Sequence, residues 1–393
     1  MRNSRIVAGI LIAFLALSAS GILGAAEPGP GGYTYDIRLF DFGCGTAAIA
    51  ITGGASEGEA EIPMKKAGTW WTASFGAGEE IEFHLLIDDL WYPRASGQKY
   101  RLKEARSIWI KDGILFPRDP TLSSAPEGLL SILSINLHTY QEADAKACLS
   151  AVAELIAKGQ VDIIAFQECA QGKDAPVVAT RDGVTVRSDN AALLIAEELK
   201  TAYGQDYAWR WDWSHYGFSV WEEGAAVMGR ASFGKAEGGM RYISASSSKT
   251  SIDSRMALYG LFQIPGFGPL TLFSTHVSWG APQIPQLRAL KAYAAEAAGT
   301  RPAIICGDFN MKYRDGGYGL MTNDKSWLDA YAAAAPWGGA DPTLNSDRID
   351  YQFTASGLVP ILSQRVFLNL GGPEAAYKRV SDHCGILVTY RAP

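Results

Sequence analysis

The sequence predicts a mainly β chain in two parts, a small all-β sandwich followed by a larger α/β domain built on two packed β-sheets with helices outside. Three observations carry this prediction. Up to residue 117 apolar and polar residues alternate as in strands, whereas from residue 129 strand-like apolar runs alternate with helical patterns. Residues 118–128 between them are rich in proline, serine and glycine, as linkers are. The length of 393 residues also favours two domains.

Residues 1–26 predict a cleavable signal peptide, and therefore a secreted or periplasmic protein. Two arginines precede an uncharged apolar run over residues 6–23, and three small residues precede Glu27. The alternative is that this run stays in place as an uncleaved membrane anchor. Cleavage removes two arginines and no acid, which takes the net charge from −6 to −8. An acidic chain gains no bulk electrostatic attraction to nucleic acid or to anionic lipid.

Residues 27–117 predict a small β-sandwich. Apolar residues alternate with polar ones over residues 33–39 and 80–87, and clusters of glycine supply the turns. The segment contains four tryptophans, which fill its core or form a platform for sugar rings: Trp70, Trp71, Trp91 and Trp109. The stretches Thr69-Trp70-Trp71, Glu80-Ile81-Glu82-Phe83 and Asp88-Asp89-Leu90-Trp91 resemble starch-binding-type carbohydrate modules. That resemblance implies a polysaccharide as a partner of this domain.

From residue 129 onward, strands and helices follow one another along the chain. Period-2 and continuous apolar runs predict strands over residues 130–136, 161–166, 207–213, 224–228, 241–245, 256–264, 270–275, 303–308, 348–354, 358–368 and 384–390. Apolar spacing near 3.6 predicts helices over residues 143–158, 190–203 and 282–298. The aromatic-rich segment 207–221 could pack in the core, stack on bases or meet a lipid interface.

Polar residues stand at the ends of several of these predicted strands. Asn136, Glu168, His276, Asp308 with Asn310, and Asp350 are each placed at a strand end next to an apolar run, and Ser381-Asp382-His383 precedes the last strand. Each alone could be an ordinary turn or cap residue. A set drawn only from Asn, Asp, Glu and His instead favours a hard-metal and acid/base site.

These motifs give residues 129–393 a resemblance to a known superfamily. The strand ending in Asn136, Gln167-Glu168, Gly307-Asp308-Phe309-Asn310, Arg348-Ile349-Asp350-Tyr351 and Ser381-Asp382-His383 occur in the order found in the endonuclease/exonuclease/phosphatase superfamily. Its members include pancreatic-type deoxyribonuclease, abasic-site nucleases, inositol polyphosphate 5-phosphatases and neutral sphingomyelinases. The resemblance implies a four-layer α/β sandwich of two mainly antiparallel sheets flanked by helices, and magnesium-dependent phosphoester hydrolysis.

The resemblance also implies roles for individual residues. Glu168 would be the main ligand of Mg²⁺ (or Mn²⁺), with Asn136 beside it and Asp382 available to a second metal or to the turn. His383 would take a proton from the attacking water while Asp350 fixes its tautomer.

The remaining residues would handle the water and the phosphate. Asp308 would orient the water, and Asn310 and Arg255 would bind the phosphate, although a surface ion pair is the other interpretation of Arg255. His276 would bind phosphate or assist the leaving group, and a histidine with only a structural hydrogen bond is its alternative.

The sequence therefore predicts a secreted, Mg²⁺-dependent phosphoesterase that hydrolyses a phosphodiester. The candidate substrates are nucleic acid and a phospholipid head group, and no stable protein partner is implied. The alternative is a non-catalytic secreted carbohydrate-binding protein that retains the phosphoesterase fold.

Overall fold

The computed structural model describes residues 32–53, 60–93, 99–122, 128–335, 339–355 and 357–392. The predicted signal peptide, residues 1–26, and part of the predicted linker, residues 123–127, lie outside the described residues. Within the described part of the chain, no helix combines the length and the apolar character that crossing a membrane requires.

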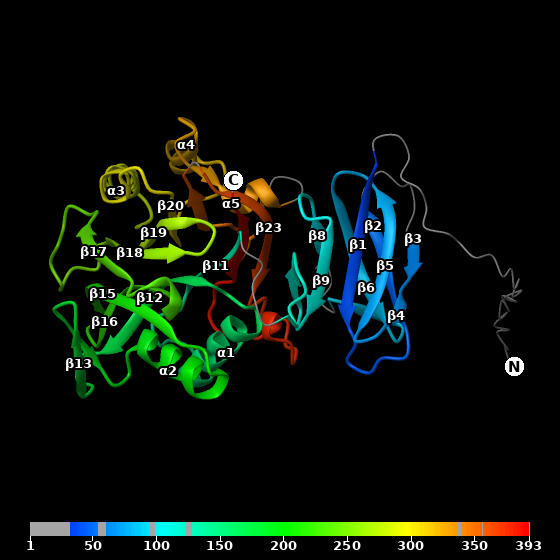
Figure 1. Cartoon of the computed structure of the whole chain (residues 1–393). Coiled ribbons are helices and arrows are strands. Elements are labelled where there is room, and N and C mark those ends of the chain that lie inside the picture. Colours follow the sequence, from blue (N-terminus) through cyan, green and yellow to red (C-terminus); the bar gives the residue numbers. More distant parts are fainter. Residues whose placement is uncertain are drawn as a thin grey trace, which may run out of the picture.

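The N-terminal β sandwich consists of two sheets that share one core (Figure 1). One sheet has the strand order β10 (Ile114–Phe116), β9 (Ser107–Lys111), β1 (Tyr33–Phe40), β5 (Trp70–Ala77) and β4 (Lys65–Ala67). The other has β3 (Ala60–Pro63), β2 (Ala47–Gly53), β6 (Ile81–Ile87) and β7 (Leu90–Tyr92), with β8 (Tyr100–Leu102) paired to β6. Trp70 and Trp71 are buried, whereas Trp91 is exposed.

The N-terminal β sandwich packs directly on the rest of the molecule. The Gln364 side chain bonds both backbone groups of Leu115, at 2.9 and 2.8 Å, and the hydroxyls of Tyr100 and Tyr377 are 2.8 Å apart. Leu362 also belongs to the core of the sandwich. The two regions are thus joined by buried apolar and polar contacts.

Two larger sheets form the centre of the second region. The first has the order β15 (Tyr207–Gly217), β16 (Trp221–Arg230), β12 (Ile163–Gly172), β11 (Leu129–Asn136), β24 (Gly385–Arg391) and β23 (Val359–Val366). The second has β17 (Glu237–Tyr242), β18 (Met256–Ile264), β19 (Gly268–His276), β20 (Ala303–Asp308), β22 (Asp350–Thr354) and β21 (Leu328–Asp329). Among the described strands of these sheets, only the pairs β11–β12 and β19–β20 run parallel.

Helices cover both outer faces of this pair of sheets, which gives the four predicted layers. Helices α1 (Ala145–Lys158) and α2 (Ala191–Tyr203) pack on the first sheet, and α3 (Gln283–Ala298) packs on the second (Figure 1). Apolar residues of the two sheets meet in a core between them, with Ile132 and Ile163 from one sheet and Leu272 and Ile304 from the other. The predicted fold class is confirmed.

Strand direction brings the predicted polar residues to one edge. Asn136 is the last residue of β11 and Glu168 lies within β12, which runs parallel to it, and His276 pairs with Asp308 at the end of the other parallel pair. Gly307 allows β19 and β20 this close approach, because a Cβ there would lie 2.2 Å from Thr275 O.

Two of the predicted strand-end positions need correction. Glu168 lies inside β12 and not at its end, because the strand continues to Gly172. Asp350 is the first residue of β22, not a residue at the end of a strand. It still reaches the common edge because β22 runs antiparallel to β20 and places Asp350 opposite Asp308.

Several elements are longer than the sequence predicts, and others were not predicted. Strand β12 continues to Gly172 and β15 to Gly217, through polar residues that the apolar runs did not include. The hairpin of β13 (Val177–Arg181) and β14 (Val184–Arg187), and the short helices α4 (Gly316–Thr322) and α5 (Ala330–Ala334), carry no long periodic pattern. The 3₁₀ turns at Ala231–Phe233 and Ala375–Tyr377 are shorter still.

Candidate active site

Glu168 reaches the site because β12 is bulged at that residue. The pairing of β12 with β16 shifts register between Phe166 and Cys169, and Glu168 has a φ of 45°. A bulge turns a side chain out of the regular alternation, and positive φ values at residues other than glycine cost energy and collect at functional sites. The bulge therefore directs the Glu168 carboxylate toward the second sheet, where His276 lies.

Asn136 and Thr139 hold two carboxylates in place. The Asn136 amide donates to Glu168 Oε1 at 2.9 Å and to Asp308 Oδ2 at 3.1 Å, while its oxygen accepts the His138 backbone N–H at 2.9 Å. The Thr139 hydroxyl lies 2.9 Å from Glu168 Oε2. Asn136 thus joins carboxylates from both sheets, with its own oxygen engaged elsewhere.

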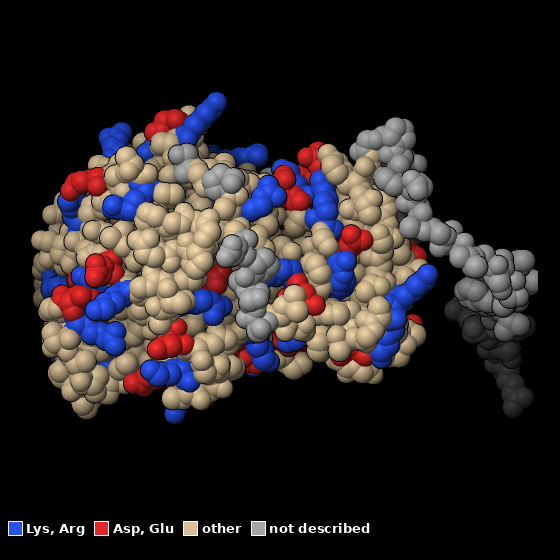
Figure 2. Space-filling view, viewed as in Figure 1, with Lys and Arg blue, Asp and Glu red and all other residues tan. Residues whose placement is uncertain are grey.

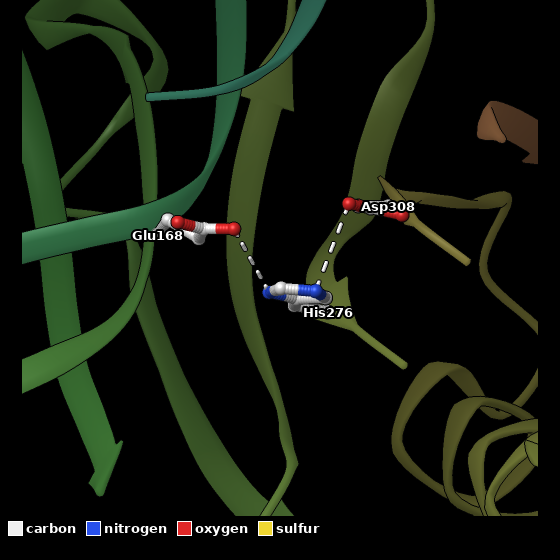
Figure 3. Close-up of side chains that lie close together, drawn as sticks. All are labelled: Glu168, His276 and Asp308. Atoms are coloured by element: carbon white, nitrogen blue, oxygen red, sulfur yellow. Dashed lines mark ion pairs between the residues drawn. The ribbon is translucent and has the colours of Figure 1, made fainter. Parts of the chain in front are cut away.

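His276 lies between Glu168 and Asp308 (Figure 3). Its Nδ1 is 3.8 Å from Glu168 Oε1 and 3.3 Å from Arg255 Nη1, and its Nε2 is 3.6 Å from Asp308 Oδ2. The Asn310 amide nitrogen is 3.0 Å from Nε2, so donors face both ring nitrogens, and a neutral ring can accept from only one of them. Burial and the Arg255 guanidinium hold the pKa of His276 well below 6.5, so this imidazole is neutral at pH 7.

The charged groups nearest to His383 are carboxylates. Its Nδ1–H donates to Asp350 Oδ2 at 2.9 Å, and its Nε2 lies 3.7 Å from Asp308 Oδ2. Burial disfavours the charged imidazolium, but the carboxylates of Asp350 and Asp308 outweigh it and raise the pKa of His383 to about 10. Asp350 fixes the tautomer, which leaves Nε2 facing the space next to Asp308.

The site collects more negative charge than its cations offset. Asp308 and Asp350 are 2% and 1% exposed, and Glu168 lies beside them with its carboxylate bonded to neutral groups. Burial and the charge of Asp350 raise the pKa of Asp308 to about 7, and burial together with Glu223 raises the pKa of Glu168. Each carboxylate would be stabilised by a nearby cation.

A divalent cation fits this donor set. Ligand atoms of Glu168, His276 and Asp308 lie within 4.8 Å of one another, as do those of Asp308, Asp350 and His383. Asp350 Oδ1 is buried and has no hydrogen-bond partner among the described residues. Mg²⁺ prefers oxygen ligands, needs only one or two carboxylates and keeps several of its waters. The residues present are therefore suited to a hard divalent metal.

The other predicted residues surround this centre. Arg255 is 5% exposed and donates from Nε to Ser278 Oγ at 3.3 Å, so it forms no surface ion pair. Asn310 has a φ of 48° and donates its amide hydrogens to His276 and to Val277 O. Asp382 lies at the exposed rim, where its Oδ1 is 3.9 Å from His383 Nε2.

Glu223 is a buried residue of the site that the sequence did not single out. Its Oε2 accepts from the Thr139 hydroxyl at 3.0 Å, and its Oε1 lies 3.4 Å from His215 Nε2 and 3.9 Å from Arg255 Nη1. His215, which had no predicted site role, is also buried. The signal was present: a Glu222-Glu223 pair stands directly before the apolar strand that was predicted from residue 224.

Residues 133–383 match a sequence profile of the endonuclease/exonuclease/phosphatase family. None of the curated proteins is significantly similar to the chain in sequence.

Solved structures of low sequence identity share the fold. An endonuclease/exonuclease/phosphatase family protein from Leptotrichia buccalis C-1013-b is 23% identical with a TM-score of 0.57, and the match covers 67% of this chain and 99% of that one. Proteins of the same description from Bacteroides thetaiotaomicron (18% identical, 68% and 99% covered) and Bacteroides vulgatus (16% identical, 67% and 99% covered) both have a TM-score of 0.50.

Proposed function

The chain belongs to the endonuclease/exonuclease/phosphatase family, and on that basis we propose that it is a divalent-metal-dependent phosphoesterase that hydrolyses a phosphodiester. The observation that carries the proposal is the buried pair of His383 and Asp350 beside Asp308, at 2.9 and 3.7 Å. In this proposal residues 129–393 are the catalytic domain, residues 27–117 are an accessory β domain, and residues 1–26 direct export.

Proton transfer at His383 is the first part of the proposed reaction. A water oxygen attacks phosphorus while one P–O bond breaks, and His383 Nε2 takes the proton that the water gives up. Asp350 keeps the ring in place by accepting the Nδ1–H. Asp308 Oδ2 lies 3.7 and 3.6 Å from the Nε2 atoms of His383 and His276, a position from which it can orient the water.

In this proposal Arg255, His276 and Asn310 face the phosphate. The Arg255 guanidinium, which contacts His276 Nδ1 at 3.3 Å, supplies the positive charge and the donors that a phosphate oxygen requires. Asn310 can donate to the phosphate only by releasing one of its two present acceptors, His276 Nε2 or Val277 O. His276, released in this way, is placed to hydrogen-bond the leaving oxygen.

A Mg²⁺ or Mn²⁺ ion held by Glu168, with Asn136 beside it and Asp382 at the rim, would draw charge from a phosphate oxygen in the transition state. His383 must be unprotonated to act as the base, yet Asp350 and Asp308 hold its pKa at about 10 in the absence of a cation. A cation held beside Asp308 would oppose that carboxylate and lower the pKa of His383 toward the range in which the ring can accept a proton from water.

The candidate substrates remain nucleic acid and a phospholipid head group. Figure 2 shows basic and acidic side chains interspersed over the visible face of both regions. Proteins that track a nucleic-acid backbone cluster lysine and arginine on one surface. On the face shown, the charges form no such cluster.

The direct test is hydrolysis of bis(4-nitrophenyl) phosphate with Mg²⁺ or Mn²⁺, with and without a chelator. We expect turnover that the chelator abolishes. A second panel compares plasmid DNA, RNA, sphingomyelin and inositol phosphates as substrates. If no substrate is hydrolysed in either test, the alternative of a non-catalytic carbohydrate-binding protein is favoured, with the exposed Trp91 as the residue to examine for polysaccharide binding.

A further inference from the structure

Exposed apolar side chains gather at the edge of the sheets that carries the candidate active site. Among the described residues after 128, eight large apolar side chains are exposed, and two of them, Leu328 and Val359, lie on β21 and β23. The other six, which we call the apolar collar, are Val177, Val178, Phe218, Val220, Ile252 and Trp279. Exposed apolar side chains that gather in one place mark a surface that binds a ligand, another protein or a membrane.

The collar lies at the site edge because each of its loops leaves a strand that ends there. The β13–β14 hairpin begins at Val177, nine residues after Glu168, and follows β12 directly in the chain, and the turn at residues 218–220 joins β15 to the start of β16. Ile252 lies three residues before Arg255, and Trp279 lies three residues after His276. Every collar residue is therefore close in sequence or in strand pairing to a residue of the site.

Hydrogen bonds connect neighbouring loops of the collar. The Lys173 backbone N–H donates to Val220 O at 3.0 Å, which joins the start of the hairpin segment to the 218–220 turn. The Tyr216 N–H donates to Lys249 O at 2.8 Å, which joins that turn to the 243–255 loop. Arg255 Nε donates to Ser278 Oγ at 3.3 Å, which joins this loop to the one that carries Trp279. The loops thus form a continuous rim.

Phe218 carries the strongest local signal. It has a φ of 50° and is followed by Ser219 with a φ of 60°, a conformation in which glycine or asparagine costs less. Its side chain is nevertheless 67% exposed, and Trp279 and Ile252 are 66% and 62% exposed. A bulky apolar residue at a strained turn that packs against little of its own chain is expected where that side chain contacts a partner.

Three of the cations near the collar are engaged within the protein. The Lys249 ammonium lies 3.8 Å from the centre of the Trp213 ring, Arg181 lies 4.3 Å from that of Trp209, and Arg187 pairs with Glu222 at 3.3 Å. A nucleic-acid strand would need cations of this kind to be available to its phosphates. The collar instead offers apolar tips, including a tryptophan, as interfacial membrane-binding surfaces do.

We propose that the apolar collar inserts into the surface of a lipid bilayer and presents phospholipid head groups to the site, so that the phosphodiester hydrolysed is that of a membrane phospholipid. This inference rests on the proposed phosphoesterase function. Several separate tips around one site suit a flat bilayer, and the phosphoester would lie at the level of the head groups just above the inserted side chains.

The test uses the chain from Glu27 onward, since the apolar run at residues 6–23 would itself bind lipid. The collar variant is Phe218→Ser with Ile252→Ser, and the matched control is Leu328→Ser with Val359→Ser, two apolar side chains exposed elsewhere. Flotation with vesicles of sphingomyelin and phosphatidylcholine measures binding. Activity is measured on the same vesicles and on bis(4-nitrophenyl) phosphate.

We expect the parent chain and the control to float with vesicles, and the collar variant to bind at least ~10-fold less and to hydrolyse vesicle lipid correspondingly slowly. All three should hydrolyse bis(4-nitrophenyl) phosphate equally. Vesicle binding that is absent in the parent, or unchanged in the collar variant, overturns the inference, as does a dimer that the collar variant converts to monomer. Vesicle binding without hydrolysis of any phosphodiester would instead refute the proposed function and leave the docking surface standing.

Discussion

The two buried histidines of the candidate site lie on either side of Asp308, yet they are built for opposite charge states. Their Nε2 atoms are 3.7 and 3.6 Å from the same Asp308 oxygen. Burial disfavours the charged form of both rings, but next to His383 the carboxylates of Asp350 and Asp308 outweigh it and raise the pKa to about 10, whereas burial together with the Arg255 guanidinium holds the pKa of His276 well below 6.5. The carboxylates next to His383 therefore distinguish the histidine that handles a proton from the one that stays neutral toward the phosphate.

The largest expected effect is the loss of activity when His383, the proposed base, is removed. His383→Ala should lower kcat on bis(4-nitrophenyl) phosphate by at least ~10², because no other described side chain has a ring nitrogen held by Asp350. His84→Ala, in β6 of the N-terminal β sandwich, is the matched control and should leave kcat unchanged. Near-parent turnover of His383→Ala would remove its role as the base.

A smaller effect, on metal affinity, is expected when a side chain that supports Glu168 is changed. Thr139→Val removes the hydroxyl that lies 2.9 Å from Glu168 Oε2, and loss of such a supporting hydrogen bond typically weakens metal affinity by about 10–100-fold. Titration of activity with Mg²⁺ measures this. Thr180→Val, at an exposed position of β13, should leave the Mg²⁺ dependence as it is. An unchanged Mg²⁺ dependence in Thr139→Val would place the metal elsewhere.

The comparison also predicts how stability depends on pH in the metal-free protein. His383 is raised from 6.5 to about 10, so its contribution is complete below pH 6.5 and is lost as pH rises toward 10. His276 is lowered, so its environment costs stability as pH falls below 6.5, where the unfolded chain binds the extra proton.

Urea unfolding between pH 7 and 10, with chelator present, measures the first of these effects. His383→Gln should flatten the profile by a slope of up to about 1.4 kcal/mol per pH unit. Equal slopes in the parent and the variant would contradict the raised pKa.

Much of the site was predictable because its residues stand next to strong apolar runs. Asp308 is the last residue of a continuous buried strand, and the other predicted residues flank similar runs. Glu168 is different: its place was predicted, but the bulge that directs its side chain depends on the pairing of β12 with β16.

What escaped prediction depends on contacts between distant segments. Glu223 enters the site through Thr139 and His215, which lie 84 and 8 residues away in sequence, and the position of Asp350 in its strand follows from pairing with β20. The apolar collar likewise needs four loops to be placed side by side, and no single stretch of sequence shows that. Local pattern predicted the strands and their polar ends, while tertiary pairing decided how those ends meet.

The most direct test of the account is an NMR titration of the imidazole rings, first with chelator and then with Mg²⁺. The chain has 5 histidines, so His→Gln variants can assign every signal. We expect metal-free His383 to stay protonated above pH 8 and His276 to stay neutral from pH 6.5 upward, and we expect Mg²⁺ to lower the pKa of His383 toward neutrality. If both rings titrate near 6.5 and Mg²⁺ changes neither, the two histidines do not differ as proposed.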